Sequence, residues 1–173
     1  MVRPLTAASA ALLLLLGAGP AARAAPAPRL TIQGYDQLKA PLPFPYDERA
    51  DAVRAVDAAR RRARAEGKLL LIDLGGNWCG DCRVLAGTIE QTELKRFVDR
   101  HYVLVAVDVG RFDKNLAIPA RYGIHDRLKG VPALLVVDPK RDRLLNAADV
   151  SALSDARHMS PQGLADYLAR WTG

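Results

Sequence analysis

The chain of 173 residues is poor in cysteine and histidine, with two cysteines and three histidines. A disulfide scaffold would show several cysteine pairs, and a tetrahedral structural zinc would require four ligands. His101, His125 and His158 have no ligand spacing to the cysteines, and Arg83 stands where a c-type haem attachment motif would carry histidine. The sequence therefore predicts no disulfide scaffold and no metal site, and we expect no cofactor.

The chain also lacks an apolar run long enough to span a membrane. The run from Ala7 to Ala18 falls short of the roughly 20 residues that a spanning helix needs. It follows the positively charged Arg3 and leads to small residues that end at Ala24. This order is typical of a secretory signal peptide over residues 1–24, cleaved after Ala24 or, alternatively, after Ala25. We expect an exported, periplasmic protein without a stable membrane anchor.

Neither sign of charge dominates. The chain has 25 Lys and Arg against 19 Asp and Glu, and removing residues 1–24 would lower the formal charge from +6 to +4, because this segment holds two Arg and no acid. A mildly basic surface of mixed sign is ordinary for a soluble domain. We therefore expect no nucleic-acid partner.

Proline marks the next segment. Residues 25–46 contain five of the 11 prolines, which predicts a Pro-rich extended leader or linker, although its apolar residues could pack on the domain. Residues 47–173 are then expected to form one domain. A helix is predicted from Asp47, as N-cap, to Glu66, ahead of Gly67.

Short apolar runs and turn signals predict the rest of this domain. The expected strands are Leu69–Leu74, Tyr102–Val109, Ala133–Val137 and Arg143–Asn146, of which the last two form a hairpin. The expected helices are Cys82–Arg100, interrupted near Gly87, a short Ala117–Tyr122, and a last helix opened by Ser160 as N-cap and Pro161. Parallel strands followed by a hairpin predict an α/β sandwich with helices on both faces of a mixed sheet.

The two cysteines lie in Cys79-Gly80-Asp81-Cys82, directly after Trp78 and at the start of a predicted helix. Helix N-termini carry unpaired N–H groups and partial positive charge, which favour a thiolate at Cys79. Cys82 faces the same side one turn deeper, so Cys79 can attack a partner disulfide and Cys82 can resolve the mixed disulfide. Gly80 leaves the approach open. In an exported protein this spacing predicts redox chemistry.

The segment from Leu71 to Arg83 resembles thioredoxins, with a strand, an acid at Asp73 and a Trp-Cys-Gly-x-Cys-basic motif. The sequence from Gly130 through Val131 and Pro132 resembles the second signature of that family, in which the proline is cis. The resemblance covers about residues 47–173. It implies a thioredoxin fold and looks closest to exported bacterial thioredoxin-like proteins that carry Gly-x-Asn-Trp-Cys before the pair.

The resemblance implies a role for each site residue. Cys79 and Cys82 would be catalytic, with Asp73 beneath Cys82 as a proton acceptor whose pKa burial raises. Trp78, Gly80, Asp81, Val131 and Pro132 would bind substrate. Trp78 would wall the pocket, Pro132 would pack against the sulfurs, and the Val131 backbone would pair with an extended substrate segment. As alternatives, Asp73 could end a strand at the surface, Trp78 could be core, and Pro132 could be a trans turn residue.

The sequence departs from thioredoxin at several positions. Gly75 and Gly76 replace bulkier residues, so packing behind the motif should differ. Asp81 replaces the usual proline, which disfavours the Cys79 thiolate and makes the protein more reducing unless Arg83 offsets the charge. The charged segment 125–129 could shape partner choice or let His125 aid proton transfer, although a plain surface loop is the favoured interpretation of His125.

These observations predict an exported thiol-disulfide oxidoreductase that reduces disulfides of exported proteins as a monomer. By analogy with the family, its electrons would come from a membrane-embedded thiol relay. An oxidant or isomerase on the same fold is the nearest alternative. A non-enzymatic protein that holds a soft metal such as Cu(I) between the two thiolates is another.

Overall fold

The computed structural model describes residues 23–173, so the predicted signal peptide lies almost wholly outside the described residues. Across 23–173, every helix falls short of the length and apolar character needed to cross a bilayer.

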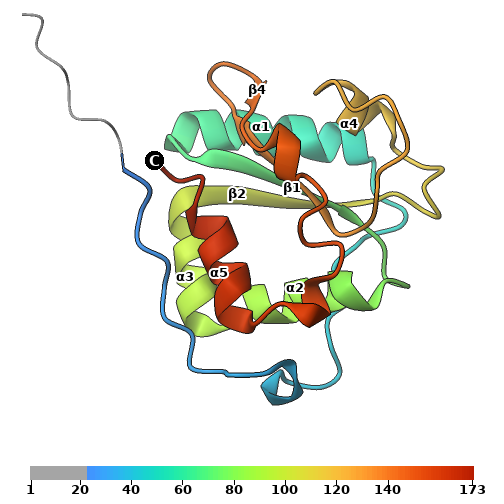
Figure 1. Ribbon diagram of the computed structural model, residues 1–173. Helices are drawn as coiled ribbons and strands as arrows, with labels where there is room; N and C mark the ends of the chain where they lie inside the picture. Colours follow the sequence, from blue (N-terminus) through green and yellow to red (C-terminus); the bar gives the residue numbers. More distant parts are fainter. Residues whose placement is uncertain (1–22) are drawn as a thin grey trace, which may run out of the picture.

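A mixed sheet forms the middle layer of the fold (Figure 1). Its strands are β1 (Leu69–Gly75), β2 (Tyr102–Asp108), β3 (Ala133–Asp138) and β4 (Arg143–Leu144), in the order β2-β1-β3-β4. β1 runs parallel to β2, and β3 runs antiparallel to both β1 and β4. The predicted parallel pair and the following hairpin are therefore confirmed.

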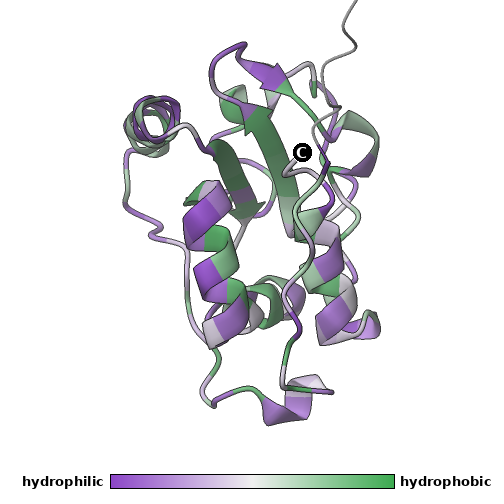
Figure 2. Cartoon of the chain, turned by 90° about the vertical axis from the view of Figure 1, so that its left-hand side faces the viewer, coloured by the Kyte–Doolittle hydropathy of each residue, from purple (hydrophilic) through white to green (hydrophobic). Residues whose placement is uncertain are grey.

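Helices cover both faces of this sheet, as predicted for an α/β sandwich. Helices α1 (Ala52–Glu66) and α4 (Ala117–Ala120) lie on one side, and α2 (Gly80–Ile89), α3 (Thr92–His101) and α5 (Pro161–Ala169) lie on the other (Figure 1). Side chains of successive strand residues point to opposite faces. Ile72 and Leu74 accordingly pack in the α1 core, and Leu71 packs in the core of α2, α3 and α5. Figure 2 shows apolar strands enclosed by helices with one apolar and one polar face.

The helix ends follow local capping chemistry. Helix α1 begins later than predicted, because its N-cap is Asp51, whose carboxylate accepts the Arg54 N–H at 3.1 Å, whereas Asp47 caps only the preceding turn. It ends at Gly67, which adopts a left-handed φ of 66° that glycine tolerates best. The Ser160 hydroxyl accepts the Gly163 N–H at 3.0 Å and caps α5 as predicted.

The break between α2 and α3 lies at Glu90 and Gln91, whereas the sequence had suggested Gly87. Gly87 is helical, and a Cβ there would lie 3.1 Å from Leu42 and 3.4 Å from Leu38. Its lack of a side chain therefore makes room for the Pro-rich leader rather than ending the helix.

The Pro-rich leader, residues 25–46, packs against the domain. It passes α5, forms the short 3-10 helix η1 (Tyr35–Gln37) and continues beneath α2 before it reaches α1 (Figure 1). Leu30, Leu38 and Tyr46 are buried, and Gln162 of α5 hydrogen-bonds the leader backbone on both sides of Arg29. The leader is thus a structural part of the fold, and its last residue reaches the site described next.

Candidate active site

The two cysteines lie where β1 passes into helix α2. Cys79 is the N-cap of α2, and its Sγ accepts the backbone N–H of Cys82 at 3.1 Å. Cys79 is 6% exposed and Cys82 is fully buried, and both thiols are free of disulfide bonds. The geometry is that of a reduced dithiol with one sulfur at the protein surface and the other behind it.

The two thiols have opposite pKa shifts. The hydrogen bond from the Cys82 thiol, helped by the Cys82 backbone N–H and opposed by burial, lowers the pKa of Cys79 to about 7. The hydrogen bond to Cys79, together with burial, raises the pKa of Cys82 well above its usual range. Cys79 is therefore the thiol that ionises more readily near neutral pH, and Cys82 needs a base before it can ionise.

Asp73, from β1, is 3% exposed and therefore does not end the strand at the surface. Burial raises the pKa of Asp73 to about 7, although a hydrogen bond from the Tyr46 hydroxyl acts in the opposite direction. That hydroxyl donates to Asp73 Oδ1 at 2.9 Å. A carboxyl group that titrates near neutral pH suits proton transfer to and from Cys82.

Asp81, between the cysteines, is paired with Arg157 of the 3-10 helix η3 (Ala156–His158). The Arg157 guanidinium donates to the carboxylate at 2.6 and 3.1 Å, and its backbone N–H donates at 2.8 Å. Burial alone would raise the pKa of Asp81, but these hydrogen bonds outweigh it and the pKa is lowered.

Arg83, which the sequence left open as a counter-charge to Asp81, does not pair with that carboxylate. Its guanidinium donates to the carbonyl of Pro43 at 3.1 Å and to that of Leu42 at 2.8 Å, and it lies 4.0 Å from the centre of the Phe44 ring. Arg83 therefore anchors the leader, because its guanidinium donates to two backbone carbonyls of that segment. The Asp81 charge is offset by Arg157 rather than by Arg83.

Trp78 forms one wall beside Cys79 and is 42% exposed, so it is not a core residue. Its Nε1 donates to the Gly110 carbonyl at 2.8 Å, and the Arg111 guanidinium lies 4.4 Å from its ring. A Cβ at Gly76 would lie 2.5 Å from Trp78 Nε1, so Gly76 permits the indole to fold back over the loop. This contact explains why a glycine stands at position 76, where thioredoxin has a bulkier residue.

The loop before β3 supplies the opposite wall. The Val131–Pro132 peptide bond is cis, and the Cys79 thiol donates to the Val131 carbonyl at 3.4 Å. Both Val131 and Pro132 are buried. Gly80, on the solvent side of α2, is exposed, and a Cβ there would make only ordinary contact with Arg157 at 3.6 Å.

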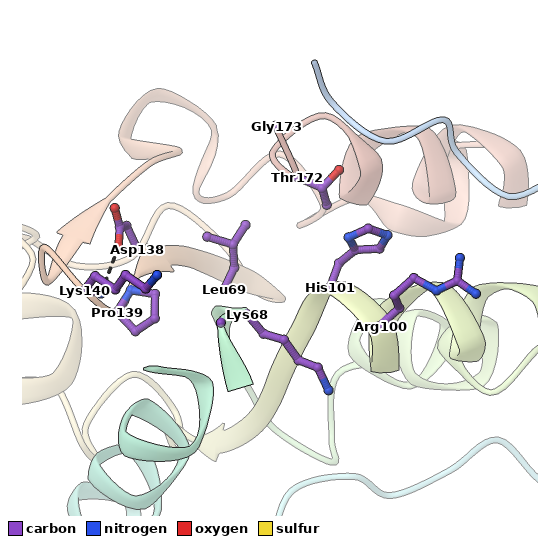
Figure 3. Close-up of a pocket in the computed structure, with 10 residues that line it drawn as sticks. Lys68, Leu69, Arg100, His101, Asp138, Pro139, Lys140, Thr172 and Gly173 are labelled. Atoms are coloured by element: carbon purple, nitrogen blue, oxygen red, sulfur yellow. Dashed lines mark hydrogen bonds between the residues drawn. The ribbon is translucent and has the colours of Figure 1, made fainter. Parts of the chain in front are cut away.

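Among the cavities in the described residues, one adjoins the loop before β3 and another lies elsewhere. A cavity of about 520 Å³ is lined by residues 123–129, which lead into Val131, and by residues 147–152 and 154. His125 is exposed at its rim. A cavity of about 260 Å³ lies at the opposite end of β1, around Lys68 and Leu69 and between His101 and Asp138 (Figure 3). This second cavity is remote from the dithiol.

The structure thus brings together every site residue predicted from the sequence and adds Tyr46, Asn77 and Arg157. Asn77 holds the Tyr46 backbone through two hydrogen bonds, at 2.8 and 3.2 Å. Residues 23–173 contain no cluster of three or more His, Cys, Asp or Glu side chains that could hold a metal.

Comparison with known proteins agrees with this geometry. A family model described as thioredoxin-like matches residues 51–139. The crystal structure of a disulphide isomerase from Xylella fastidiosa Temecula1 is 36% identical, covers 76% of this chain and 99% of its own, and superposes with a TM-score of 0.69. A protein of unknown function from Pseudomonas aeruginosa aligns over 69% of this chain and 82% of its own at 16% identity, with a TM-score of 0.39 that carries no weight. The matched family and the Xylella structure together show that this chain belongs to the thioredoxin-like family, as a member with the fold and dithiol of a thiol-disulfide oxidoreductase.

Proposed function

We propose that this protein is an exported, monomeric thiol-disulfide oxidoreductase that reduces disulfides of other exported proteins. The observation that carries the proposal is the asymmetry of the dithiol. Cys79 lies at the rim against the Val131 carbonyl, while Cys82 is fully buried behind it in the same cluster. One sulfur is placed to attack a partner, and the other is placed to attack only the first.

In the first step, a substrate segment lies along Val131, between Trp78 and the loop 125–129. The Cys79 thiolate attacks one sulfur of the substrate disulfide, whose S–S bond breaks as the new S–S bond forms. The departing substrate sulfur takes the electron pair as a thiolate. The backbone N–H of Cys82 stabilises the Cys79 thiolate before attack.

In the second step, Asp73 accepts the proton of Cys82, and the Cys82 thiolate attacks Cys79 Sγ. The mixed disulfide breaks, the second substrate sulfur leaves as a thiolate, and Cys79 and Cys82 become joined. The substrate gains two electrons and the protein loses two. A thiol relay in the membrane would restore the dithiol in the oxidising compartment.

The lowered pKa of Cys79 supports the reductive direction. Its value of about 7 matches the pKa of about 7 that a reducing thioredoxin has at the same position, whereas a strong periplasmic oxidant has about 3.5. A very acidic thiol stabilises the reduced form and makes a protein oxidising. The modest shift therefore favours a reductant.

The mechanism is tested by two serine variants in an insulin-disulfide reduction assay. Cys79→Ser should abolish turnover because no nucleophile remains at the rim. Cys82→Ser should instead accumulate mixed disulfides with substrates, since the resolving sulfur is gone. Retained turnover in the Cys79 variant, or no trapped substrate in the Cys82 variant, would contradict the assigned roles.

Export is supported by the sequence of residues 1–24. The test is the mass of the mature protein recovered from a cell envelope fraction, for which the expected first residue is Ala25. An intact Met1 in the cytoplasmic fraction would contradict export.

A disulfide isomerase is the second candidate, and the name of the Xylella relative favours it. An isomerase rearranges scrambled disulfides without net loss of them, and it needs Cys79 more than Cys82. Recovery of activity from scrambled ribonuclease, undiminished in Cys82→Ser, would favour isomerisation over reduction.

A further inference from the structure

Tyr46, the last residue of the leader, lies inside the candidate active site although it precedes the motif in sequence. Its side chain is 3% exposed, and it joins the cluster that contains Cys79 and Cys82. Its hydroxyl donates to Asp73 Oδ1 at 2.9 Å. Burial, followed by the charge of Asp73, raises the pKa of Tyr46 well above its usual range, so the hydroxyl stays a donor.

Gly75 shows how closely this hydroxyl approaches the resolving sulfur. A Cβ at Gly75 would lie 2.3 Å from Tyr46 Oη and 2.8 Å from Cys82 Sγ. The two polar atoms therefore converge on one small volume at the end of β1. A side chain at Gly75 would displace the hydroxyl, so this glycine and Tyr46 depend on each other.

The residue after the glycine pair holds the backbone of Tyr46. The Asn77 side-chain amide donates to the Tyr46 carbonyl at 2.8 Å, and its oxygen accepts the Tyr46 N–H at 3.2 Å. Arg83 fixes the leader just before Tyr46, through the Leu42 and Pro43 carbonyls. Gly75, Asn77 and Arg83 thus each help to hold this tyrosine in place.

Asp73 has few neighbours that could stabilise its charge. Among the hydrogen bonds described for residues 23–173, the one from Tyr46 is its sole side-chain partner. The titratable groups that act on it are Tyr46 from the leader and the two thiols of α2, Cys79 and Cys82. Within residues 23–173 no lysine or arginine hydrogen-bonds Asp73, so the Tyr46 hydroxyl is the group that most stabilises its charged form.

We propose that Tyr46 is a positioning residue for thiol-disulfide exchange, which holds the Asp73 carboxylate beside Cys82 and keeps it able to accept the Cys82 proton. This inference rests on the proposed function, because it concerns the second step of that mechanism. Tyr46 acts through Asp73 and does not contact the substrate.

The test separates the two steps with an aromatic disulfide, dithiobis(nitrobenzoate), added in stoichiometric amount. Attack by Cys79 breaks the reagent disulfide and releases a first coloured thiolate. Cys82 then gives its proton to Asp73 and bonds to Cys79 Sγ, and breaking the mixed disulfide releases a second thiolate. The protein ends as the Cys79–Cys82 disulfide, and the reagent has gained both electrons.

Tyr46→Phe should leave the first release within twofold of wild type and slow the second about fivefold at pH 7, because the ionised fraction of Asp73 falls from about one half to about one tenth. Losing a hydrogen bond to a charged group should also move the midpoint of the pH profile of the second release upward by roughly one unit. The difference should close at high pH, where Asp73 is ionised in both proteins. Asn77→Ala, which loosens Tyr46 but keeps its hydroxyl, should slow the second release by a smaller factor.

Tyr102→Phe is the matched control, because its hydroxyl donates to the Leu168 carbonyl at 2.6 Å in the core of the other sheet face. It should lower stability without altering either release or the pH midpoint. In an Asp73→Asn background, Tyr46→Phe should have no further effect on the second release, because the group it positions is already gone.

Three outcomes would each overturn the role of Tyr46. The second release of Tyr46→Phe could keep the wild-type rate and pH midpoint, both releases could slow equally, or the effect of Tyr46→Phe could add fully to that of Asp73→Asn. These outcomes leave the dithiol mechanism intact. A wild-type protein that releases no second thiolate would instead overturn the proposed function itself.

Discussion

The Asp81–Arg157 pair influences the ionisation of Cys79, and its disruption gives a quantitative prediction. In the native protein Asp81 disfavours the Cys79 thiolate, while Arg157 and that thiolate stabilise each other. Replacing Arg157 with Ala removes every side-chain donor to the carboxylate. The Asp81 charge then acts on Cys79 with only the backbone N–H of residue 157 still bound to it, and the pKa of Cys79 should rise.

A charge within a few ångströms shifts a pKa by about 1 to 3 units, and the loss of a counter-charge shifts it back by a similar amount. The Arg157 side chain is 58% exposed, so solvent screens part of the effect and the lower end, about one unit, applies. The thiolate fraction at pH 7 would fall from about one half to about one tenth. The more basic thiolate is about threefold more nucleophilic. Alkylation should therefore slow about twofold at pH 7 and accelerate about threefold at pH 10.

The assay is the rate of Cys79 alkylation by iodoacetamide across pH, with modification at Cys79 confirmed by mass spectrometry. Arg157→Lys keeps the charge and should stay close to wild type. Asp81→Asn removes the repelling carboxylate and leaves Arg157, so its midpoint should move downward. An Arg157→Ala midpoint that is unchanged or lower would refute this account of the pair.

Three further predictions follow from single contacts. Asp73→Asn should raise the free energy of unfolding by up to about 4 kcal/mol at pH 8 and leave it nearly unchanged at pH 4. The folded pKa of about 7 exceeds the unfolded value of 3.8, so the stability of the native protein falls as pH rises through this window. Urea unfolding of both proteins at both pH values measures the difference. Arg83→Ala should lower the free energy of unfolding by about 1–3 kcal/mol and speed proteolysis of the leader, since two hydrogen bonds to it are lost; unchanged cleavage would contradict the anchoring role. Gly76→Ala should displace the Trp78 indole from Gly110 and shift its fluorescence, with Trp171→Phe as the background that isolates the signal.

The sheet and the dithiol could be predicted because their signals are local. The apolar run ending at Gly75 and the Cys79–Cys82 spacing each lie within a few residues, and the strand and the helix N-terminus that they predict are both present. The N-cap of α5 could be predicted for the same reason, because Ser160 and Pro161 are adjacent in sequence.

What escaped prediction depends on contacts between distant segments. Arg157 pairs with a residue 76 positions away, and no local pattern distinguishes it from the other arginines. Arg83 is adjacent to the motif in sequence, but helical geometry turns it toward the leader. The N-cap of α1 was misplaced for a related reason, since Asp47 and Asp51 are both capping residues and only the path of the leader selects the second.

From the sequence, Tyr46 is only one of the apolar residues of the Pro-rich segment that could pack on the domain. A signal for it existed in Gly75, which replaces a bulkier residue of thioredoxin and therefore implied that another side chain fills the space behind the motif. The sequence does not show which residue occupies this space, because hydrophobic periodicity predicts helices and strands but not where the residues of a loop pack.

The reduction potential of the Cys79–Cys82 couple tests the central claim most directly. Trp78 fluorescence, followed through dithiothreitol and glutathione buffers in the Trp171→Phe background, would report the transition. A reductant should show a value near the roughly −270 mV of thioredoxin. A value near about −120 mV would contradict the reductive direction and make the protein an oxidant.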